Sequence, residues 1–261
     1  MNVVDDEGTR VSLPASVSRV VSLVPSLTEA VGVTAPGLLV GATDWCTHPD
    51  DLDEHGVTRV RGTKNPDVDA IVALAPDLVL ANAEENKPAE LDRLRESGLA
   101  VYVTDIRDVD GALRSLERML AACGLERPAW IDGARAAWDA LALPDAPRRA
   151  VVPIWRKPWM AVGSDTFTGA VLARLGVENV LDDSPERYPR FDPAELPAHD
   201  LVVLPDEPYR FTADDGPESF AAPAALVSGR LLTWYGPSLL EAARVLPAEL
   251  AAAGEATPAA R

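Results

Sequence analysis

Basic residues are scarce in this sequence, and their scarcity excludes several kinds of partner. The 261 residues include 24 Lys and Arg against 41 Asp and Glu, which gives a formal net charge of −17. Such an imbalance repels phosphate backbones and anionic membrane surfaces, and no basic cluster interrupts it. We therefore expect no nucleic-acid partner.

Residues that form disulfides or bind metals are also few. The two cysteines, Cys46 and Cys123, lie far apart without metal-type spacing, and the only histidines are His48, His55 and His199. A zinc or manganese site needs several His, Cys or carboxylate ligands that converge. We expect neither a disulfide framework nor a metal site of the protein's own.

The motifs of common enzymes are absent as well. The sequence contains no G-x-G-x-x-G after a strand, no G-x-x-x-x-G-K-S/T and no G-x-S-x-G. Glu84 and Glu85 are neighbouring carboxylates, but adjacent side chains diverge, so we interpret them as part of a solvated loop. The sequence predicts no catalytic residue and no cofactor.

Long apolar runs are missing too. No stretch approaches about 18 uninterrupted apolar residues, so we expect no insertion into a membrane. The first residues, from Met1 to Glu7, are acidic where a secretory signal needs positive charge and then an apolar run. As written, the chain is expected to carry no export signal, which would make it cytoplasmic.

What the sequence does contain is an internal near-repeat of short apolar runs and helix-like segments. With 47% hydrophobic and 25% charged residues, the composition is that of an ordinary globular protein. Four pairs of segments echo one another: 19–24 with 159–162, 38–41 with 177–181, 71–85 with 195–208, and 98–105 with 229–236. Short strands that alternate with helices indicate β–α–β units and parallel sheets.

The repeat predicts an α/β protein with two Rossmann-like lobes. We place the N-terminal α/β lobe at 1–107, a connecting helical segment at 108–143 and the C-terminal α/β lobe at 144–250. Within the connection, 110–122 and 127–141 have helical spacing, and Trp130 and Trp138 fall on one apolar face. The Ala/Gly/Pro-rich tail, 251–261, is predicted to be disordered.

The segment that follows the first strand is a candidate ligand contact. In open parallel sheets, ligands gather at the carboxyl ends of the strands, where helices begin. Pro25 and Ser26 occupy such a place, and Ser26 and Glu29 have the spacing of a capping box. We assign Glu29 to the cap and the surface formed by Pro25 and Ser26 to ligand binding.

Tryptophans give a second signal. Aromatic residues make up only 5% of the chain, yet four of its six tryptophans fall at predicted strand ends or just beyond them. Flat rings that line a cleft suit a large planar or semi-apolar ligand. These four are Trp45, Trp155, Trp159 and Trp234, although any one of them could instead close the end of a core.

Several motifs resemble one receptor family. They are "RVVSLVPSLTEAV" (19–31), "GATDWCTHP" (41–49), "RVRGTKNPDVDAIVALAPDLVLAN" (59–82) and "WRKPWMAVGSDTFTGAVLARLGVENVLDD" (155–183). The chain is similar to the vitamin-B12-binding branch of the helical-backbone metal receptors, the substrate-binding proteins of ABC importers for cobalamin and ferric siderophores. The resemblance extends to about Leu246. It implies two α/β lobes joined by a single connecting helix, with a ligand cleft between them.

The resemblance also implies roles for particular residues. Its aromatic ligand contacts match Trp45, Tyr188, Trp159 and Trp234, and Pro25 matches a cleft-lining proline. Thr63 and Lys64 stand where some members place an aromatic contact. Family members dock on their permease through one exposed carboxylate per lobe. The matches are Asp69 in the first lobe, where glutamate is commoner, and Asp192 or Glu195 in the second.

We therefore expect a monomeric solute-binding protein that captures cobalamin or a related corrinoid for an ABC importer. The amide and phosphate groups of the corrinoid would contact backbone groups and residues such as Lys64, Arg156 and Arg187. A ferric-siderophore or haem receptor is one alternative, because Arg156, Arg187, Arg190 and Arg210 could converge on an anionic chelate. A cytosolic cofactor-handling enzyme on a related scaffold is another. Members of the family work outside the cytoplasm, in the periplasm or anchored as lipoproteins. The acidic N-terminus of this sequence instead predicts a cytoplasmic location.

Overall fold

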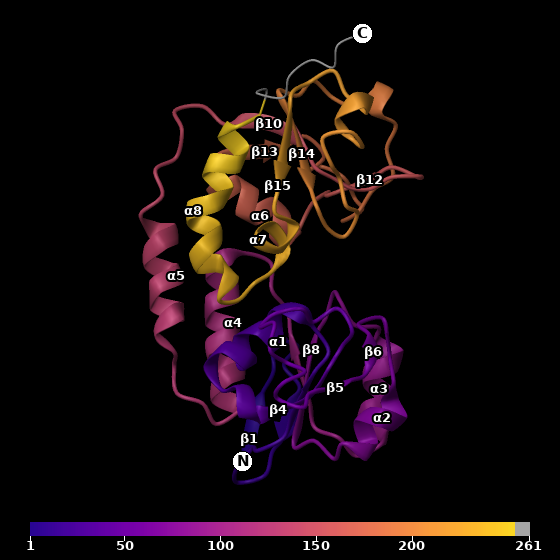
Figure 1. Cartoon of the computed structure of the whole chain (residues 1–261), viewed down its shortest axis with the longest axis vertical. Helices are drawn as coiled ribbons and strands as arrows, with labels where there is room; N and C mark the ends of the chain where they lie inside the picture. The colour runs from indigo at the N-terminus through magenta and orange to yellow at the C-terminus, as the bar shows by residue number, and fades with distance from the viewer. Residues whose placement is uncertain (254–261) are drawn as a thin grey trace. The chain divides into compact units, whose positions relative to one another are not determined.

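The computed structural model describes residues 1–253, and they divide into two compact α/β units (Figure 1). The first unit comprises Met1–Ile106, Asp110–Asp132 and Tyr235–Pro237. The second comprises Arg107–Val109, Gly133–Trp234 and the residues from Ser238 on. Of the tail predicted to be disordered, 251–261, Ala251 is instead the last residue of helix α8 (Ser238–Ala251), and residues 254–261 lie outside the described residues. Among residues 1–253, no helix combines the length and the apolar character that crossing a membrane requires.

The first unit is built on a five-stranded parallel sheet of order β5-β4-β3-β8-β9. Strands β3, β8 and β9 are buried along their whole length, as a parallel sheet covered on both faces requires, whereas the edge strand β5 is exposed. The small sheets β1–β2 and β6–β7 are antiparallel hairpins. The elements are β1 (Asn2–Val4), β2 (Arg10–Ser12), β3 (Val20–Ser22), α1 (Pro25–Thr34), η1 (Pro36–Leu38), β4 (Leu39–Ala42), β5 (Thr58–Arg59), β6 (Arg61–Gly62), β7 (Asn65–Pro66), α2 (Val68–Ala73), β8 (Leu78–Asn82), α3 (Pro88–Glu96), β9 (Val101–Thr104) and α4 (Val109–Ala122).

The second unit contains a four-stranded parallel sheet of order β13-β10-β14-β15 and a short antiparallel pair, β11–β12. Helix α8 packs against β15 and α7. The elements are β10 (Arg148–Val151), β11 (Pro153–Trp155), β12 (Met160–Ala161), α6 (Phe167–Arg174), β13 (Val177–Asn179), η2 (Pro193–Glu195), β14 (Leu201–Pro205), η3 (Pro217–Ser219), β15 (Ala224–Val227), α7 (Gly229–Thr233) and α8 (Ser238–Ala251).

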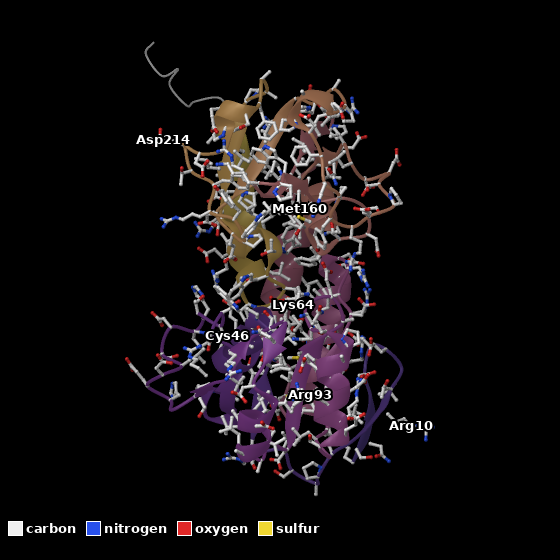
Figure 2. The ribbon with its side chains drawn as sticks, turned by 90° about the vertical axis from the view of Figure 1, so that its right-hand side faces the viewer. Arg10, Cys46, Lys64, Arg93, Met160 and Asp214 are labelled. Atoms are coloured by element: carbon white, nitrogen blue, oxygen red, sulfur yellow. The ribbon has the colours of Figure 1, made fainter. Side chains whose placement is uncertain are left out.

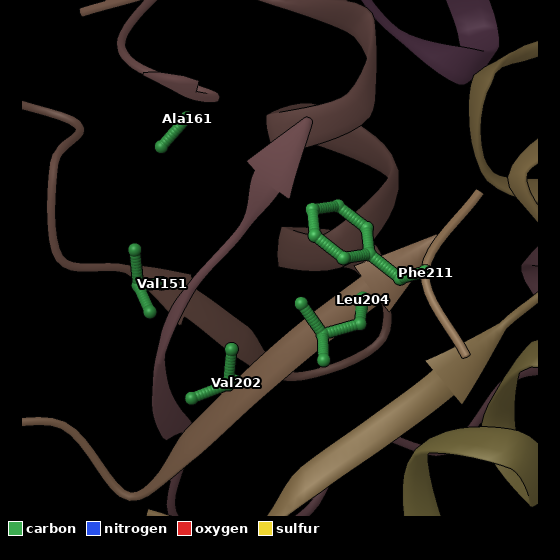
Figure 3. Packing of buried hydrophobic residues seen from close by; sticks show 5 residues of the cluster. All are labelled: Val151, Ala161, Val202, Leu204 and Phe211. Atoms are coloured by element: carbon green, nitrogen blue, oxygen red, sulfur yellow. The ribbon is translucent and has the colours of Figure 1, made fainter. Parts of the chain in front are cut away.

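One core cluster of the second unit supports its candidate site. Val202 and Leu204 project from β14 against Phe211, with Val151 and Ala161 in the same cluster (Figure 3). All five side chains are buried, with at most 3% exposed. Burial of such side chains stabilises a fold by roughly 1.5–3 kcal/mol each. The loops that follow β10 and β14 therefore start from a rigid base.

The two parallel sheets share one topology, which confirms the predicted duplication. The order β13-β10-β14-β15 of the second unit matches β4-β3-β8-β9 of the first unit, which adds β5, the third strand along the chain, at the edge beyond β4. Two of the four predicted echoes are correct, because β4 corresponds to β13 and β8 to β14.

The other two echoes are wrong. The counterpart of β3 is β10, whereas segment 159–162 contributes β12 to the antiparallel pair. The counterpart of β9 is β15, and residues 229–233 form helix α7. The Ser228 side chain accepts a hydrogen bond from the Leu231 amide, so it caps this helix and ends the strand before it.

Both helices expected in the connecting segment are present. They are α4 and α5 (Ala129–Asp139), and the division between the units falls inside α5, after Asp132. Trp138 is 2% exposed, and its indole N–H donates to the Leu239 carbonyl in α8 at 2.9 Å. Trp130 is half-buried, and its N–H donates to Thr34 Oγ1 at 3.1 Å. These two tryptophans are therefore structural, as predicted.

A carboxylate at the start of the first sheet gives a testable pH dependence. Asp77 accepts hydrogen bonds from the Ser18 amide at 2.7 Å, the Ser18 hydroxyl at 2.9 Å and the Arg19 amide at 3.0 Å. Foremost among the causes, the Ser18 backbone hydrogen bond lowers the pKa of Asp77 below its ordinary 3.8. Its stabilising effect is therefore complete above that value and is lost as the pH falls through the lowered pKa.

We expect Asp77→Asn to reduce the free energy of unfolding at pH 7 by about 1 kcal/mol, because the side chain is partly exposed. Urea denaturation of both proteins at pH 7 and at progressively lower pH measures the difference. It should shrink as the wild-type carboxylate becomes protonated. Asp214→Asn, at an exposed loop position, is the control and should change little at either pH. A difference for Asp77→Asn that stays constant down to the lowest pH would contradict this role.

Candidate functional site

The shared topology determines where each unit can receive a ligand. In each sheet the chain adds strands first on one side of the first strand, β3 or β10, and then on its other side, and a crevice opens at the carboxyl ends of the first strand and of the strand across this switch, β8 or β14. In the first unit these ends precede Pro25 and Glu84. In the second unit they precede Trp155 and Tyr209. Candidate residues from both units therefore occupy the position that ligands favour in such sheets.

Helix α1 begins at Pro25, directly after β3, and this differs from the predicted cap. Its N-cap is Val24, whose side chain makes no capping hydrogen bond, so the expected capping box of Ser26 and Glu29 does not form. A proline in the first turn lacks an N–H and needs no cap. Ser26 is 2% exposed, and its Oγ accepts a hydrogen bond from the Tyr235 amide at 3.3 Å. Pro25 is the half-buried member of the pair.

Trp45 presents an open ring on a well-anchored loop. Its side chain is 66% exposed, and a Cβ at Gly62 would lie 3.3 Å from the indole nitrogen. The next residue, Cys46, is buried, with Sγ 3.0 Å from Thr28 Oγ1, and Arg59 donates to the Cys46 carbonyl at 2.7 Å. Burial raises the pKa of the Cys46 thiol, so this residue acts as an anchor in its thiol form.

Thr63 and Lys64, in the β6–β7 turn, are attached to the loop that follows β8. Lys64 is labelled in Figure 2. Its ammonium donates to the Glu84 carbonyl at 2.6 Å. The Asn86 side-chain amide donates to the Thr63 carbonyl at 2.9 Å. The turn and the loop consequently form one surface beside the carboxyl end of β8.

Tyr235 is a residue of this surface that the sequence did not reveal. It begins a short stretch of the first unit, Tyr235–Pro237, that lies between two stretches of the second along the chain, and it is only 5% exposed. Its hydroxyl donates to Glu85 Oε1 at 2.9 Å. Burial, followed by the Glu85 charge, raises the pKa of Tyr235 well above its usual value, so the phenol stays protonated. Glu84 and Glu85 are half-buried, which corrects the expected solvated loop.

We expect Tyr235→Phe to reduce the free energy of unfolding by roughly 1–2 kcal/mol, because the Glu85 carboxylate loses a buried donor. Thermal unfolding of the variant measures this loss. The double variant Tyr235→Phe/Glu85→Gln tests the cause, because a neutral amide tolerates the missing donor better than a carboxylate does. Full additivity of the two single substitutions would show that the hydroxyl and the carboxylate do not interact.

In the second unit, Trp155 and Trp159 belong to an aromatic group. Trp155 is 44% exposed and meets Tyr209 edge to face, with ring centroids 5.6 Å apart. Trp159 is half-buried and stacks on Phe211 at 6.0 Å with an interplanar angle of 3°. Trp159 therefore packs the group against the core at Phe211, and Trp155 is the ring whose surface is most exposed to solvent.

Arg156 is engaged with protein groups rather than held open for a ligand anion. Its guanidinium lies 5.3 Å from the centre of the Trp159 ring and forms ion pairs with Asp215 and, at 2.5 Å, with Glu218. The Tyr209 hydroxyl donates to Asp215 at 2.6 Å, and this hydrogen bond is the main cause that lowers the pKa of Asp215. The pairs fix the loop after β14 beneath Trp155.

Tyr188 and Trp234 occupy different surroundings. Tyr188 is half-buried and lines a cavity of about 470 Å³ together with Met160, Ser184, Pro185, Glu186, Pro189 and Arg190. Trp234 is only 7% exposed, and Arg230 lies 5.7 Å from its ring centre. Little of the Trp234 ring is free to stack on a ligand, whereas Tyr188 faces open space. Both assignments to ligand binding remain predictions.

The three candidate docking carboxylates are all exposed. Asp69 lies in the first turn of α2. Asp192 caps η2 by accepting a hydrogen bond from the Ala194 amide at 2.9 Å, and Glu195 lies in η2 itself. Within residues 1–253, no group of three or more His, Cys, Asp or Glu side chains could hold a metal ion.

Each unit thus has a parallel sheet with aromatic side chains near its carboxyl end. No family model matches the chain. Over 257 residues it is 23% identical to the vitamin B12-binding protein of Pectobacterium carotovorum, a match that covers 90% of this chain and 88% of the relative.

Solved structures show the same fold. The periplasmic vitamin B12 binding protein BtuF of Vibrio cholerae superposes with a TM-score of 0.74 at 19% identity, over 91% of this chain and 98% of the other. The periplasmic heme-binding protein RhuT of Roseiflexus sp. RS-1 superposes with a TM-score of 0.76 at 17% identity, over 90% and 98%. The resemblance to this receptor family indicated by the sequence motifs is confirmed.

Proposed function

We propose that this protein captures cobalamin or a related corrinoid and delivers it to an ABC importer. The observation that carries the proposal is a pair of exposed indoles near the carboxyl ends of the two sheets: Trp45 on an anchored loop after β4, and Trp155 at the end of the short strand β11. Flat, rigid rings bury ligand area with little loss of rotamer freedom. The relatedness to proteins named vitamin B12-binding protein supports the choice of ligand.

We propose ligand contacts in each unit by itself. In the first unit they are Trp45, the surface at Pro25 and Ser26, and the turn at Thr63 and Lys64. In the second unit Trp155 supplies the main aromatic surface, with contributions from Trp159, Tyr188 and Trp234. Because Ser26 and Trp234 are nearly buried, they would act through the shape of the surface rather than through wide contact.

Charge favours a neutral or cationic ligand over an anionic chelate. Two of the four arginines on which a ferric-siderophore site would depend are already engaged. Arg156 pairs with Asp215 and Glu218, and Arg187 donates to the Asp165 carbonyl at 2.8 Å. The formal net charge of −17 adds long-range repulsion of anions.

Haem is the second candidate, and one feature favours it. Tyr188 lines the cavity of the second unit, and tyrosine can serve as an axial ligand of haem iron. Some proteins of the same fold are described as heme-binding. Against haem stands the acidic balance of the chain, because haem carries propionates.

We further propose that the protein binds without bond chemistry and works outside the cytoplasm beside a permease. Its relatives are named as binding proteins, and solved structures of the same fold are described as periplasmic. Asp69 on α2 and Asp192 or Glu195 at η2 are the proposed docking carboxylates, all exposed. Since Asp192 already caps η2, Glu195 is the freer of the two.

Titration calorimetry with three chelates tests the proposal. Cyanocobalamin, hemin and a ferric catecholate siderophore are titrated separately into the purified protein, and each is then used to displace the others. We expect cyanocobalamin to bind with a dissociation constant of about 1 μM or lower, which corresponds to roughly −8 kcal/mol. Tight binding of hemin with no response to cyanocobalamin would favour the second candidate instead.

A further inference from the structure

The segment from Ser184 to Arg190 carries Tyr188 and lines the cavity of the second unit. This segment is hydrogen-bonded to the end of β12 and to the residues that follow it. The Ala161 amide donates to the Pro189 carbonyl at 3.0 Å, and the Gly163 amide donates to the Arg187 carbonyl at 2.8 Å. The Ser164 hydroxyl donates to the Ser184 carbonyl at 2.7 Å. These hydrogen bonds determine the height of the cavity loop, defined here as residues 184–190.

The loop approaches Gly163 so closely that no side chain fits there. A Cβ at Gly163 would lie 2.2 Å from the Glu186 carbonyl oxygen and 2.9 Å from Pro189 Cδ. The first contact is with backbone, which cannot rotate away as a side chain would. The φ angle of Gly163 lies outside the left-handed region, so the torsion angles would permit alanine. Lack of space is the reason for glycine at this position.

If a side chain were added, the loop rather than Gly163 would move. The Asn179 side-chain amide donates to the Gly163 carbonyl at 3.2 Å and to the Val162 carbonyl at 2.9 Å, and Asn179 is itself buried. The Val162 amide donates to the Val152 carbonyl at 2.9 Å. Gly163 is thus fixed from below, next to the central sheet, whereas the cavity loop lies partly exposed above it.

We propose that Gly163 is a positioning residue for ligand binding: its missing side chain sets the height of the cavity loop and so places Tyr188. This inference rests on the proposed function, because it assigns Tyr188 to the ligand. Gly163 itself would touch no ligand. A methyl group there would lift the loop, break the hydrogen bond to Arg187 and move the Tyr188 ring away from its binding position.

The test compares Gly163→Ala, Tyr188→Ala and the double variant in cyanocobalamin titrations. We expect each single variant to bind about 10-fold more weakly, as the loss of a moderate interface contact does. The double variant should bind no more weakly than Tyr188→Ala, because a displaced ring and an absent ring are equivalent. Gly37→Ala, where a Cβ meets nothing within 4 Å, is the matched control and should bind as the wild type does.

A structural readout separates this inference from the proposed function. Hydrogen exchange of the Ala161 and Gly163 amides, which donate to the loop, should accelerate in Gly163→Ala whether or not a corrinoid binds. Failure of the wild type to bind cyanocobalamin would overturn the function and leave this readout intact. Two results would overturn the positioning role. One is Gly163→Ala with the exchange rates and the affinity of the wild type. The other is a double variant whose loss of affinity is the product of the two single losses. If Gly163→Ala does not fold, Ser164→Ala loosens the same loop without added volume and should weaken binding about 3-fold; wild-type binding by Ser164→Ala would then overturn it.

Discussion

Replacing Trp45 or Trp155 by alanine weakens cyanocobalamin binding by about 10- to 100-fold, the range that buried aromatic anchors contribute at interfaces. Both rings are open in the free protein: Trp45, 66% exposed, lies on an anchored loop, and Trp155, 44% exposed, ends strand β11. The ligand would cover ring surface that is exposed to water in the free protein. Removing the ring should therefore lower the affinity more than the stability. Titration calorimetry of the two variants measures the effect.

The matched control for these two substitutions is Leu143→Ala. Leu143 is also a large apolar residue, 64% exposed, but it lies in the stretch between α5 and β10, before the amino-terminal end of that strand. It should leave the affinity unchanged. The midpoints of thermal unfolding should stay close to the wild-type value in all three variants. Unchanged affinity in both Trp45→Ala and Trp155→Ala would remove the aromatic surface from the account.

Replacing Trp138 by alanine has the opposite signature, with a large loss of stability and little change in affinity. The ring is 2% exposed, and its N–H donates to the Leu239 carbonyl. Large-to-small substitutions of buried aromatics cost about 3–5 kcal/mol, because transfer energy is lost and a cavity remains. Urea denaturation measures the free energy of unfolding.

Trp138→Phe divides that cost into its parts. Phenylalanine retains most of the buried ring but leaves the Leu239 carbonyl without its donor, so we expect a loss of roughly 1–3 kcal/mol. Near-equal losses for phenylalanine and alanine would mean that the hydrogen bond, not the ring, carries the stability. A strong loss of ligand affinity in Trp138→Phe while the protein remains folded would place Trp138 in the binding surface and contradict its structural role.

The contrast among the tryptophans shows how far the sequence could predict the site. Position relative to strand ends separated Trp130 and Trp138 from the remaining four, and the structure places both in packed, hydrogen-bonded surroundings. The same rule did not distinguish Trp234, which follows a helix rather than a strand and is nearly buried. Exposure depends on neighbours distant in sequence, and local pattern carries no information about them.

The fold was predictable where the strands are long and apolar. β8 and β14 each consist of five fully buried residues, and their sequences identify them correctly as equivalent strands of the repeat. β10 starts with two arginines, and β15 is a short edge strand with alternating burial, so neither stood out as a core strand. The repeat was therefore aligned with the wrong segments at those two places, although the two-unit architecture was correct.

Two contacts of the candidate site could not be found from sequence: the hydrogen bond of Tyr235 and the ion pairs of Arg156. Tyr235 is brought to Glu85 across 150 residues of chain by a segment that joins the first unit between two stretches of the second. Arg156 was expected to meet ligand, but Asp215 and Glu218 lie about 60 residues away in sequence and reach it only in the folded chain. One signal was available for the cap of α1: a proline directly before Ser26 favours a helix that starts there without a side-chain cap.

The most direct test of the central claim is co-elution of corrin absorbance with the protein. The purified chain is incubated with excess cyanocobalamin and passed through a gel-filtration column, and visible and ultraviolet absorbance are recorded together. The account predicts a red protein peak with about one corrinoid per chain, reduced in the double variant Trp45→Ala/Trp155→Ala. A colourless wild-type peak, with all of the corrinoid in the small-molecule fraction, would contradict it.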